Sequence, residues 1–200
     1  IKNFKDNNTS HLGIEPSSNV ARIAKELGVN ILERFFDVEC SNYVRKEYGS
    51  ADAILAANVI CHIPNILELA KGVKNLLKPS GVMIFEEPYL GDVIKKTSYD
   101  QIYDEHVFLF SAISVQYLFD KVGMELIDLI PQKTHGGSMR YVLAHKNYYE
   151  IKSSVNEIIN NEIEQGLDKL ETFQKFNQNV IDSKKQLLKL LEELKLNGKK

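Results

Sequence analysis

The sequence predicts an α/β domain built on a mostly parallel sheet with helices on both faces and an antiparallel hairpin at the sheet edge, followed by a long helical tail. Short, continuously apolar runs alternate with amphipathic stretches up to about residue 88, which is typical of a parallel sheet covered on both faces. Two further apolar runs then follow each other across a short glycine-containing turn, as in a hairpin. From Tyr149 onward, apolar residues recur every three or four positions, which indicates helix.

The individual elements can be followed in chain order. Strands are expected in the runs HLGIE, VNILE, ADAILAANVI and GVMIFEEP, which are residues 11–15, 29–33, 51–60 and 81–88. Helices are expected at residues 16–28, 38–49, 65–81 and 111–123. The first of these helices can begin at Pro16 and Ser17 and end at Gly28, because proline suits the first helical turn and glycine suits the position after the last. The hairpin strands are expected at residues 124–132 and 138–146.

Composition excludes several classes of protein. The 200 residues are 44% hydrophobic, which is enough for one core, and the formal net charge of −2 offers no field that would gather nucleic acid or membrane lipid. Cys40 and Cys61 have a spacing that fits neither a metal site nor a disulfide framework, so we expect free core thiols in a reducing cytoplasm. No apolar run approaches the roughly 20 residues of a membrane span, and the first residues lack the apolar core of a signal peptide.

Polar side chains follow the carboxyl ends of two predicted strands. Glu15 ends the first strand, and Asn58 and His62 close the third. Ligands of open parallel sheets bind outside these strand ends, where an acid commonly accepts hydrogen bonds from ribose hydroxyls. An acid at a helix start is also favoured by the helix dipole, and a histidine after an apolar strand is often structural. From these residues alone, both interpretations stay open.

The stretch SYDQIYDEHVFLFS, residues 98–111, crowds titratable groups into the connection after the last parallel strand. Tyr103, Glu105 and His106 bring together a phenol that can donate, a carboxylate that can orient a base, and a base whose ordinary pKa lies near neutrality. This combination indicates proton abstraction. The alternative is that Glu105 and His106 form a surface pair while Tyr103 packs. The other acids of the stretch, Asp100 and Asp104, are expected to be solvated.

The stretch KTHGGSMR, residues 133–140, connects the two hairpin strands. Paired glycines let the backbone approach a ligand, and the donors around them could bind a phosphate or sugar hydroxyls. These donors are Lys133, His135, Ser138 and Arg140. A hairpin needs glycine in any case, so turn geometry alone explains Gly136 and Gly137. Turn geometry does not explain the cluster of donors.

Five segments together resemble the sugar C-methyltransferase family, which uses S-adenosylmethionine to methylate nucleotide-linked keto-deoxysugars. They are GIEPSSNVA, AANVICHIPN, FEEPYL, YDQIYDEHVFLFS and THGGSMRYVLAH. The similarity runs from about Phe4 to His145, and the last three segments are specific to this family. A parallel sheet that ends in an antiparallel hairpin is also the arrangement of class I methyltransferases, although the pattern alone leaves a flavodoxin-like or Rossmann sheet open.

The resemblance implies methyl transfer to a carbon beside a ketone, by way of an enolate. His106 looks like the general base, with Tyr103 and Glu105 beside it and His62 across the pocket holding the ketone oxygen. No metal is expected in this site, because a preorganised donor can stabilise the enolate. The residues implied to bind S-adenosylmethionine are Glu15 on the ribose, the adjacent Pro16, and Asn58 near the methionine end. Those implied to face the sugar nucleotide are His135, Gly136, Gly137, Ser138 and Arg140.

The resemblance also implies that the chain is a fragment. The family's first strand and glycine-rich loop would precede IKNF, its small zinc module would lie further upstream, and another α/β domain would follow. Residues 1–148 are therefore predicted to be a methyltransferase-like domain without its first strand, and residues 149–200 a helical connector. We expect the fragment by itself to be inactive and its apolar tail to permit self-association.

Two other functions remain as alternatives. One is methyl transfer to an oxygen or nitrogen of a small molecule, since an acid and a histidine also suit an oxygen nucleophile. The other is a non-catalytic scaffold that keeps the fold, although a scaffold has no need of Tyr103, Glu105, His106 and His62 together.

Overall fold

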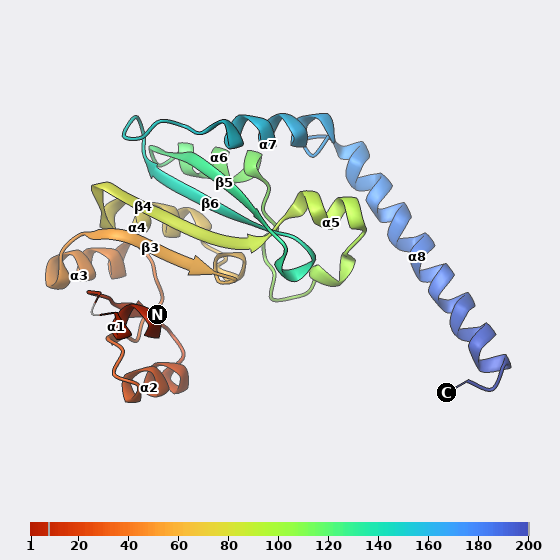
Figure 1. Cartoon of the computed structure of the whole chain (residues 1–200), viewed down its shortest axis with the longest axis horizontal. Coiled ribbons are helices and arrows are strands. Elements are labelled where there is room, and N and C mark those ends of the chain that lie inside the picture. Colours follow the sequence, from red (N-terminus) through yellow and green to blue (C-terminus); the bar gives the residue numbers. More distant parts are fainter. Residues whose placement is uncertain (8, 200) are drawn as a thin grey trace.

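A computed structural model describes residues 1–7 and 9–199, and its strands form two sheets (Figure 1). Strands β1 (Gly13–Ile14) and β2 (Ile31–Leu32) pair in parallel as one small sheet. The larger sheet has the order β3-β4-β6-β5, parallel between β3 and β4 and antiparallel at both other pairings. Its members are β3 (Ala51–Ala57), β4 (Leu77–Pro88), β5 (Met124–Gln132) and β6 (Ser138–His145). The predicted edge hairpin is confirmed, whereas β4 begins earlier than predicted, at Leu77.

The predicted helices are confirmed, and local signals explain where they begin and end. They are α2 (Ser18–Glu26), α3 (Val38–Tyr48), α4 (Ile66–Leu76) and α6 (Ala112–Asp120). The carboxylate of Asp37 accepts the N–H of Cys40 at 2.7 Å and caps α3. Ser111 and Ser114 form a reciprocal capping box at the start of α6. The chain leaves α2 at Gly28, whose φ of 75° suits glycine. The short helix α5 (Leu90–Lys96) was not predicted, and α1 (Lys2–Asp6) precedes the first strand.

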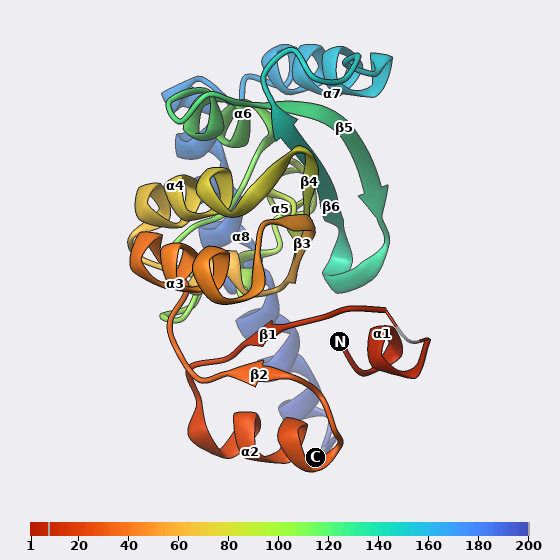
Figure 2. The same ribbon diagram turned by 90° about the vertical axis from the view of Figure 1, so that its left-hand side faces the viewer.

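The core lies between the larger sheet and a layer of helices. Figure 2 shows α3, α4 and α6 stacked along one side of this sheet. Phe85 of β4 and Tyr141 of β6 are paired in register on that side, and their rings stack with centroids 4.6 Å apart. Both side chains are buried, and complete burial of a large apolar side chain contributes about 1.5–3 kcal/mol. On the opposite face of β3, Leu55 is 50% exposed, whereas β1 and β2 lie between α2 and α3 in Figure 2.

Helix α3 holds the two sheets together. Cys40 and Val44 of this helix are buried against residues of β1, β2 and β3, among them Ile14, Leu32 and Ile54. Among the described residues β1 pairs only with β2, and β3 pairs only with β4. One edge of each of these strands therefore has no strand partner among the described residues.

The tail forms two helices with different environments. Helix α7 (Ser153–Glu164) contacts α6 and β5, and it buries Val155 and Glu162. Gly166, with a φ of 69°, separates it from α8 (Leu170–Leu196). Helix α8 extends away from the sheets in Figure 1 and has no buried residue. The domain boundary at residues 148 and 149 stays a prediction.

Both cysteines are buried and free, as predicted. Across residues 1–7 and 9–199, no helix combines the length and apolar character that crossing a bilayer requires.

Candidate active site

Two histidines from separate segments meet at one place. His62 closes the short 3₁₀ helix η1 (Ile60–His62) that follows β3, and His106 lies in the loop between η2 (Tyr99–Gln101) and α6. Their ring centroids are 5.1 Å apart. A surface cavity of about 350 Å³ lies beside His62, and its lining residues are His62, Asp104, Glu105 and Val107. The structure thus brings His62 and His106 together, as the sequence indicated.

Backbone carbonyls orient both imidazole rings. Nδ1 of His106 lies 2.8 Å from the carbonyl oxygen of Gln101, and Nδ1 of His62 lies 2.7 Å from that of Glu105. A carbonyl oxygen can only accept, so each Nδ1 carries a proton and each Nε2 of a neutral ring is an acceptor. The Tyr103 hydroxyl lies 2.7 Å from Nε2 of His106 and donates to it. The arrangement therefore presents a basic Nε2 on each ring and a phenol that steadies one of them.

The Glu105 carboxylate was expected to orient the base, but among the described residues the structure shows no contact between this carboxylate and a histidine. The Glu105 side chain is exposed, and only its backbone oxygen contacts a histidine, namely His62. The carbonyl of Gln101 orients His106 instead, because the loop folds back on itself between these residues. Sequence reasoning missed Gln101, since a backbone carbonyl leaves no signal in residue type. Asp100 and Asp104 are exposed, as expected.

The carboxyl end of β4 is where the segments of the site converge. Pro88 at this end pairs with Ser138, which places the hairpin turn beside it. The loop of residues 98–111 returns to the same end through a bridge between Tyr89 and Phe110. The N–H of Phe108 donates to the carbonyl of Cys61 at 3.2 Å, which ties this loop to η1.

Glu87, the penultimate residue of β4, is fully buried at this junction and was also missed. Its Oε1 accepts backbone N–H groups from η1 and the residue before it. A signal was present, because Met83, Phe85 and Glu87 alternate along one strand and must face the same side of the sheet.

Cys61, His62 and His106 are the described residues whose donor atoms approach the spacing of a metal site, since these atoms lie within 4.8 Å of one another. Nitrogen and sulfur donors of this kind suit zinc. Burial, and then the neighbouring Glu87 side chain, raise the pKa of the Cys61 thiol to about 12, however, so the thiol keeps its proton. The donor set fits proton transfer better than metal binding.

The residues expected to hold a cofactor follow the ends of β1 and β3. Oε1 of Glu15 accepts the N–H of Ser17 at 2.8 Å, so the carboxylate does support the start of α2, and it leaves Oε2 for a ligand. Asn58 is exposed, has a φ of 51°, and donates its N–H to the carbonyl of Glu86 at 2.9 Å. Pro16 is exposed. Glu15 and Asn58 thus follow strands of two different sheets.

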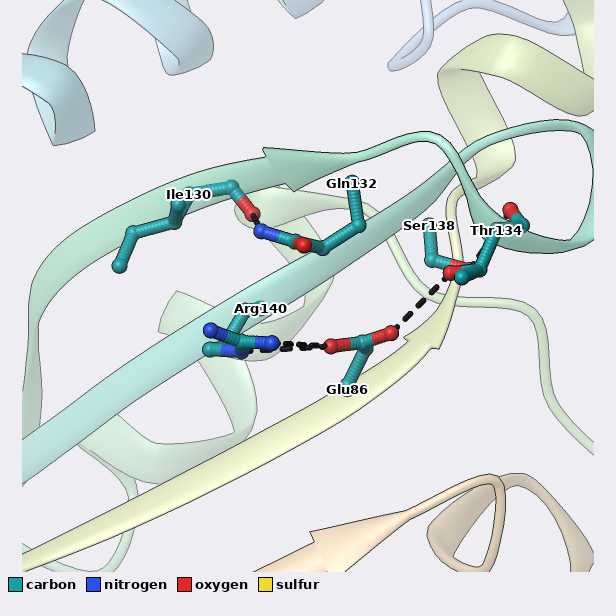
Figure 3. A network of polar contacts seen from close by, with 6 residues as sticks. All are labelled: Glu86, Ile130, Gln132, Thr134, Ser138 and Arg140. Carbon is teal, nitrogen blue, oxygen red and sulfur yellow. Dashed lines mark hydrogen bonds and ion pairs between the residues drawn. The ribbon is translucent and has the colours of Figure 1, made fainter.

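Figure 3 shows how the hairpin strands use the predicted substrate-binding donors. Arg140 pairs with Glu86 across β6 and β4, with Nη2 2.8 Å and Nε 3.2 Å from Oε2. The Thr134 hydroxyl donates to Oε1 of Glu86 at 3.1 Å. Ser138 is buried and its hydroxyl donates to the carbonyl of Thr134 at 3.2 Å. Arg140 and Ser138 are therefore already engaged within the protein.

The remaining residues of the turn are more open. His135 is exposed with a φ of 51°, and Gly136 has open space where a Cβ would stand. Gly137 has a φ of 136° and is packed against the carboxylate of Asp92, so a side chain there would be strained. Lys133 is exposed. Of the predicted donors, His135 and Lys133 are the ones that the turn leaves accessible.

Comparison with known proteins places this geometry in a family. Residues 1–129 match the family described as "Methyltransferase domain", and residues 133–200 match the family described as "C-methyltransferase C-terminal domain". The C-methyltransferase NovU of Streptomyces niveus is 29% identical over 189 residues, which cover 94% of this chain and 45% of that protein. The chain thus spans a little under half the length of this relative.

Solved structures show the same fold. A SAM-dependent methyltransferase from Anabaena variabilis superposes with a TM-score of 0.52 at 17% identity, covering 68% of each chain. An S-adenosylmethionine-dependent methyltransferase from Clostridium acetobutylicum superposes with a TM-score of 0.51 at 12% identity, covering 70% of this chain and 76% of that one. The class I methyltransferase-like fold is therefore confirmed.

Proposed function

This chain belongs to the methyltransferase-domain family and continues into a C-methyltransferase C-terminal domain, and from that premise we propose that the protein transfers a methyl group from S-adenosylmethionine to a carbon next to a ketone of a nucleotide-linked deoxysugar. The observation that carries this proposal is the pair His62 and His106, each with its Nδ1–H held by a carbonyl and its Nε2 basic. Methyl transfer to carbon requires a base, because the carbon must first lose a proton.

The proposed reaction assigns a role to each group of the pair. Nε2 of His106 takes the proton from the carbon beside the ketone, and the electrons of the broken C–H bond move onto the ketone oxygen. His62, 5.1 Å away between ring centroids, helps to hold that oxygen as it gains charge. The enolate carbon would then bond to the methyl group as the bond from that methyl to the sulfonium sulfur breaks, with the electron pair of the broken bond staying on sulfur, and His106 returns its proton to solvent. Tyr103 steadies the imidazole through its hydrogen bond to Nε2 before the substrate binds, and its hydroxyl leaves Nε2 when that nitrogen takes the proton.

The residues present fit the cofactor that this reaction needs. S-adenosylmethionine, when bound, supplies the electrophilic methyl group. Oε2 of Glu15 is the acceptor we assign to the ribose hydroxyls, because Oε1 is already fixed by the N–H of Ser17. Asn58, at the end of β3, is assigned to the methionine end. The accessible part of the hairpin turn around His135 is assigned to the sugar nucleotide.

Replacement of the base in the full-length protein tests the proposal. His106→Ala is expected to lower turnover on a panel of keto-sugar nucleotides by about 10²–10⁴-fold, the usual contribution of a general base, with S-adenosylmethionine affinity nearly unchanged. Solvent deuterium exchange at the substrate carbon should be lost with it. Asp100→Asn, a change at an exposed acid of the same segment, serves as the matched control.

The outcomes also separate the alternatives. Turnover by His106→Ala close to that of the wild type would remove this residue from the role of base. Methylation of an oxygen or nitrogen, without exchange at carbon, would instead identify a heteroatom methyltransferase. Absence of any transfer by the full-length wild type would favour a scaffold.

A further inference from the structure

We propose that Glu87 is a positioning residue that sets where His62 stands in the active site, by clamping the turn that follows β3. The functional part of this inference rests on the proposed function, whereas its geometric part does not. Glu87 contacts neither histidine through a hydrogen bond, so its action is indirect.

One oxygen of Glu87 collects three successive backbone donors. Oε1 accepts the N–H groups of Val59 at 3.0 Å, Ile60 at 2.7 Å and Cys61 at 3.3 Å. N–H groups at the start of a helix have no partner within it and need an acceptor from elsewhere. Glu87 therefore supplies from β4 the acceptor that this turn lacks.

The clamped turn, residues 59–61, lies directly between the predicted site residues Asn58 and His62. Asn58 precedes it, in a left-handed conformation with a φ of 51°. His62 follows it, and the His62 N–H donates to the carbonyl of Val59 at 3.1 Å inside the same turn. The carbonyl of Cys61 accepts the N–H of Phe108, from the segment that carries His106. A shift of the turn would therefore displace His62 relative to His106.

The position of Glu87 favours this role over ordinary packing. It occupies an inward position after Met83 and Phe85, where an apolar residue would bury itself at no polar cost. Its Oε2 is buried and has no hydrogen-bond partner among the described residues. A buried polar atom without a partner costs free energy, and natural proteins tolerate such costs mainly at functional sites.

Substitutions of Glu87 in the full-length protein separate positioning from general stabilisation. Glu87→Ala removes the acceptor, whereas Glu87→Gln keeps a carbonyl oxygen that can take the place of Oε1. Asp128→Ala is the matched control, because Asp128 is also a buried carboxylate that accepts from a backbone N–H and two side chains, and it lies in β5 away from the site. Should Glu87→Ala fail to fold, Glu87→Asp gives the same test, since its side chain is one methylene too short.

Two measurements are made on each variant. Long-range ¹H–¹⁵N spectra of histidine-labelled protein report whether His62 carries its proton on Nδ1, and steady-state assays report kcat and KM for methyl transfer. Glu87→Ala is expected to lose the Nδ1–H signature of His62 and to lower kcat by roughly 10²-fold, the scale of an ångström-sized misplacement. Glu87→Gln should keep the signature and recover kcat to within about tenfold of the wild type, because a neutral acceptor is weaker than a charged one.

Each outcome decides for or against the inference. A normal His62 signature and normal kcat in Glu87→Ala would overturn it, and so would a Glu87→Gln variant as damaged as Glu87→Ala. Equal loss of the signature in Asp128→Ala would show that general loosening, and not the clamp, displaces His62. If the wild type proved unable to transfer methyl groups, the proposed function would fail while the spectra still decided the role of Glu87.

Discussion

Glu162 of α7 is the residue whose replacement most directly tests how the tail is joined to the sheet domain. It is fully buried, and its carboxylate accepts the N–H of Ala112 at 2.6 Å, the N–H of Ile113 at 2.9 Å and the hydroxyl of Tyr89 at 2.9 Å. The first two donors begin α6, so a side chain of one helix caps the start of another. Glu162→Ala removes the acceptor of all three donors.

The expected loss of stability follows from these contacts. An unsatisfied buried donor costs about 1–3 kcal/mol, and Glu162→Ala leaves three donors without their acceptor at once. Burial, and then the charge of Glu162, raise the pKa of the Tyr89 phenol well above its ordinary value, so Tyr89 remains a donor wherever the protein is folded. We therefore expect Glu162→Ala to lower the free energy of unfolding by about 3–5 kcal/mol, a large part of the roughly 5–15 kcal/mol of a typical domain.

Urea denaturation followed by circular dichroism measures this loss. Tyr89→Phe removes one donor alone and should cost about 0.5–1.5 kcal/mol. The double variant should lose less than the sum of the single variants, because the Tyr89 hydroxyl no longer lacks an acceptor in it. A loss below about 1 kcal/mol for Glu162→Ala would refute the reasoning, since one buried and two partly buried donors cannot all lose their acceptor at so small a cost.

Three further predictions follow from other parts of the structure. Glu15→Ala in the full-length protein should weaken S-adenosylmethionine binding by about 1.5–3 kcal/mol and leave sugar-nucleotide binding unchanged, and calorimetry showing equal losses for both ligands would assign Glu15 to the start of α2 alone. At Asp128, burial raises the carboxyl pKa, but the hydrogen bonds from Lys152 and Ser154 outweigh it and the net pKa is lowered. The ionised Asp128 carboxylate therefore stabilises the fold above its ordinary pKa, and this contribution is lost as the pH falls through the pKa of the folded state. The difference in unfolding free energy between wild type and Asp128→Asn should therefore shrink below about pH 4. A difference that stayed constant from about pH 7 to pH 3 would contradict this. Residues 1–200 alone should bind S-adenosylmethionine only weakly and should self-associate, because β1 and β3 each have an unpaired edge and α8 exposes leucines. Micromolar binding in calorimetry by a protein that is monomeric in light scattering would disprove this prediction.

Much of the fold could be predicted from the sequence because the signals involved are local. Apolar runs of strand length, glycines after helix ends and serines or aspartates before helix starts act within a few residues. The hairpin of β5 and β6 was predicted to within a residue for the same reason. Strands β1 and β2 came out shorter than predicted, because a strand lengthens only where partners exist on its edges, and pairing is not a local property.

For the candidate site too, the residue types could be predicted from the sequence and the contacts between distant segments could not. Residue types and their order after strand ends were enough to single out Tyr103, His106 and His62, since chemistry of this kind requires those side chains. The partners that orient the rings are the backbone carbonyls of Gln101 and Glu105, and no residue type encodes them.

What the sequence by itself determined was therefore the class of fold, the set of chemically capable residues and the family they resemble. Only the tertiary structure decided which of those side chains are engaged with the protein itself, as Arg140 is with Glu86, and which buried carboxyl groups hold separate segments together, as Glu87 and Glu162 do. The physical reason is that a hydrogen bond depends on distance and direction between atoms, and segments far apart in the chain acquire these only when the whole core has packed.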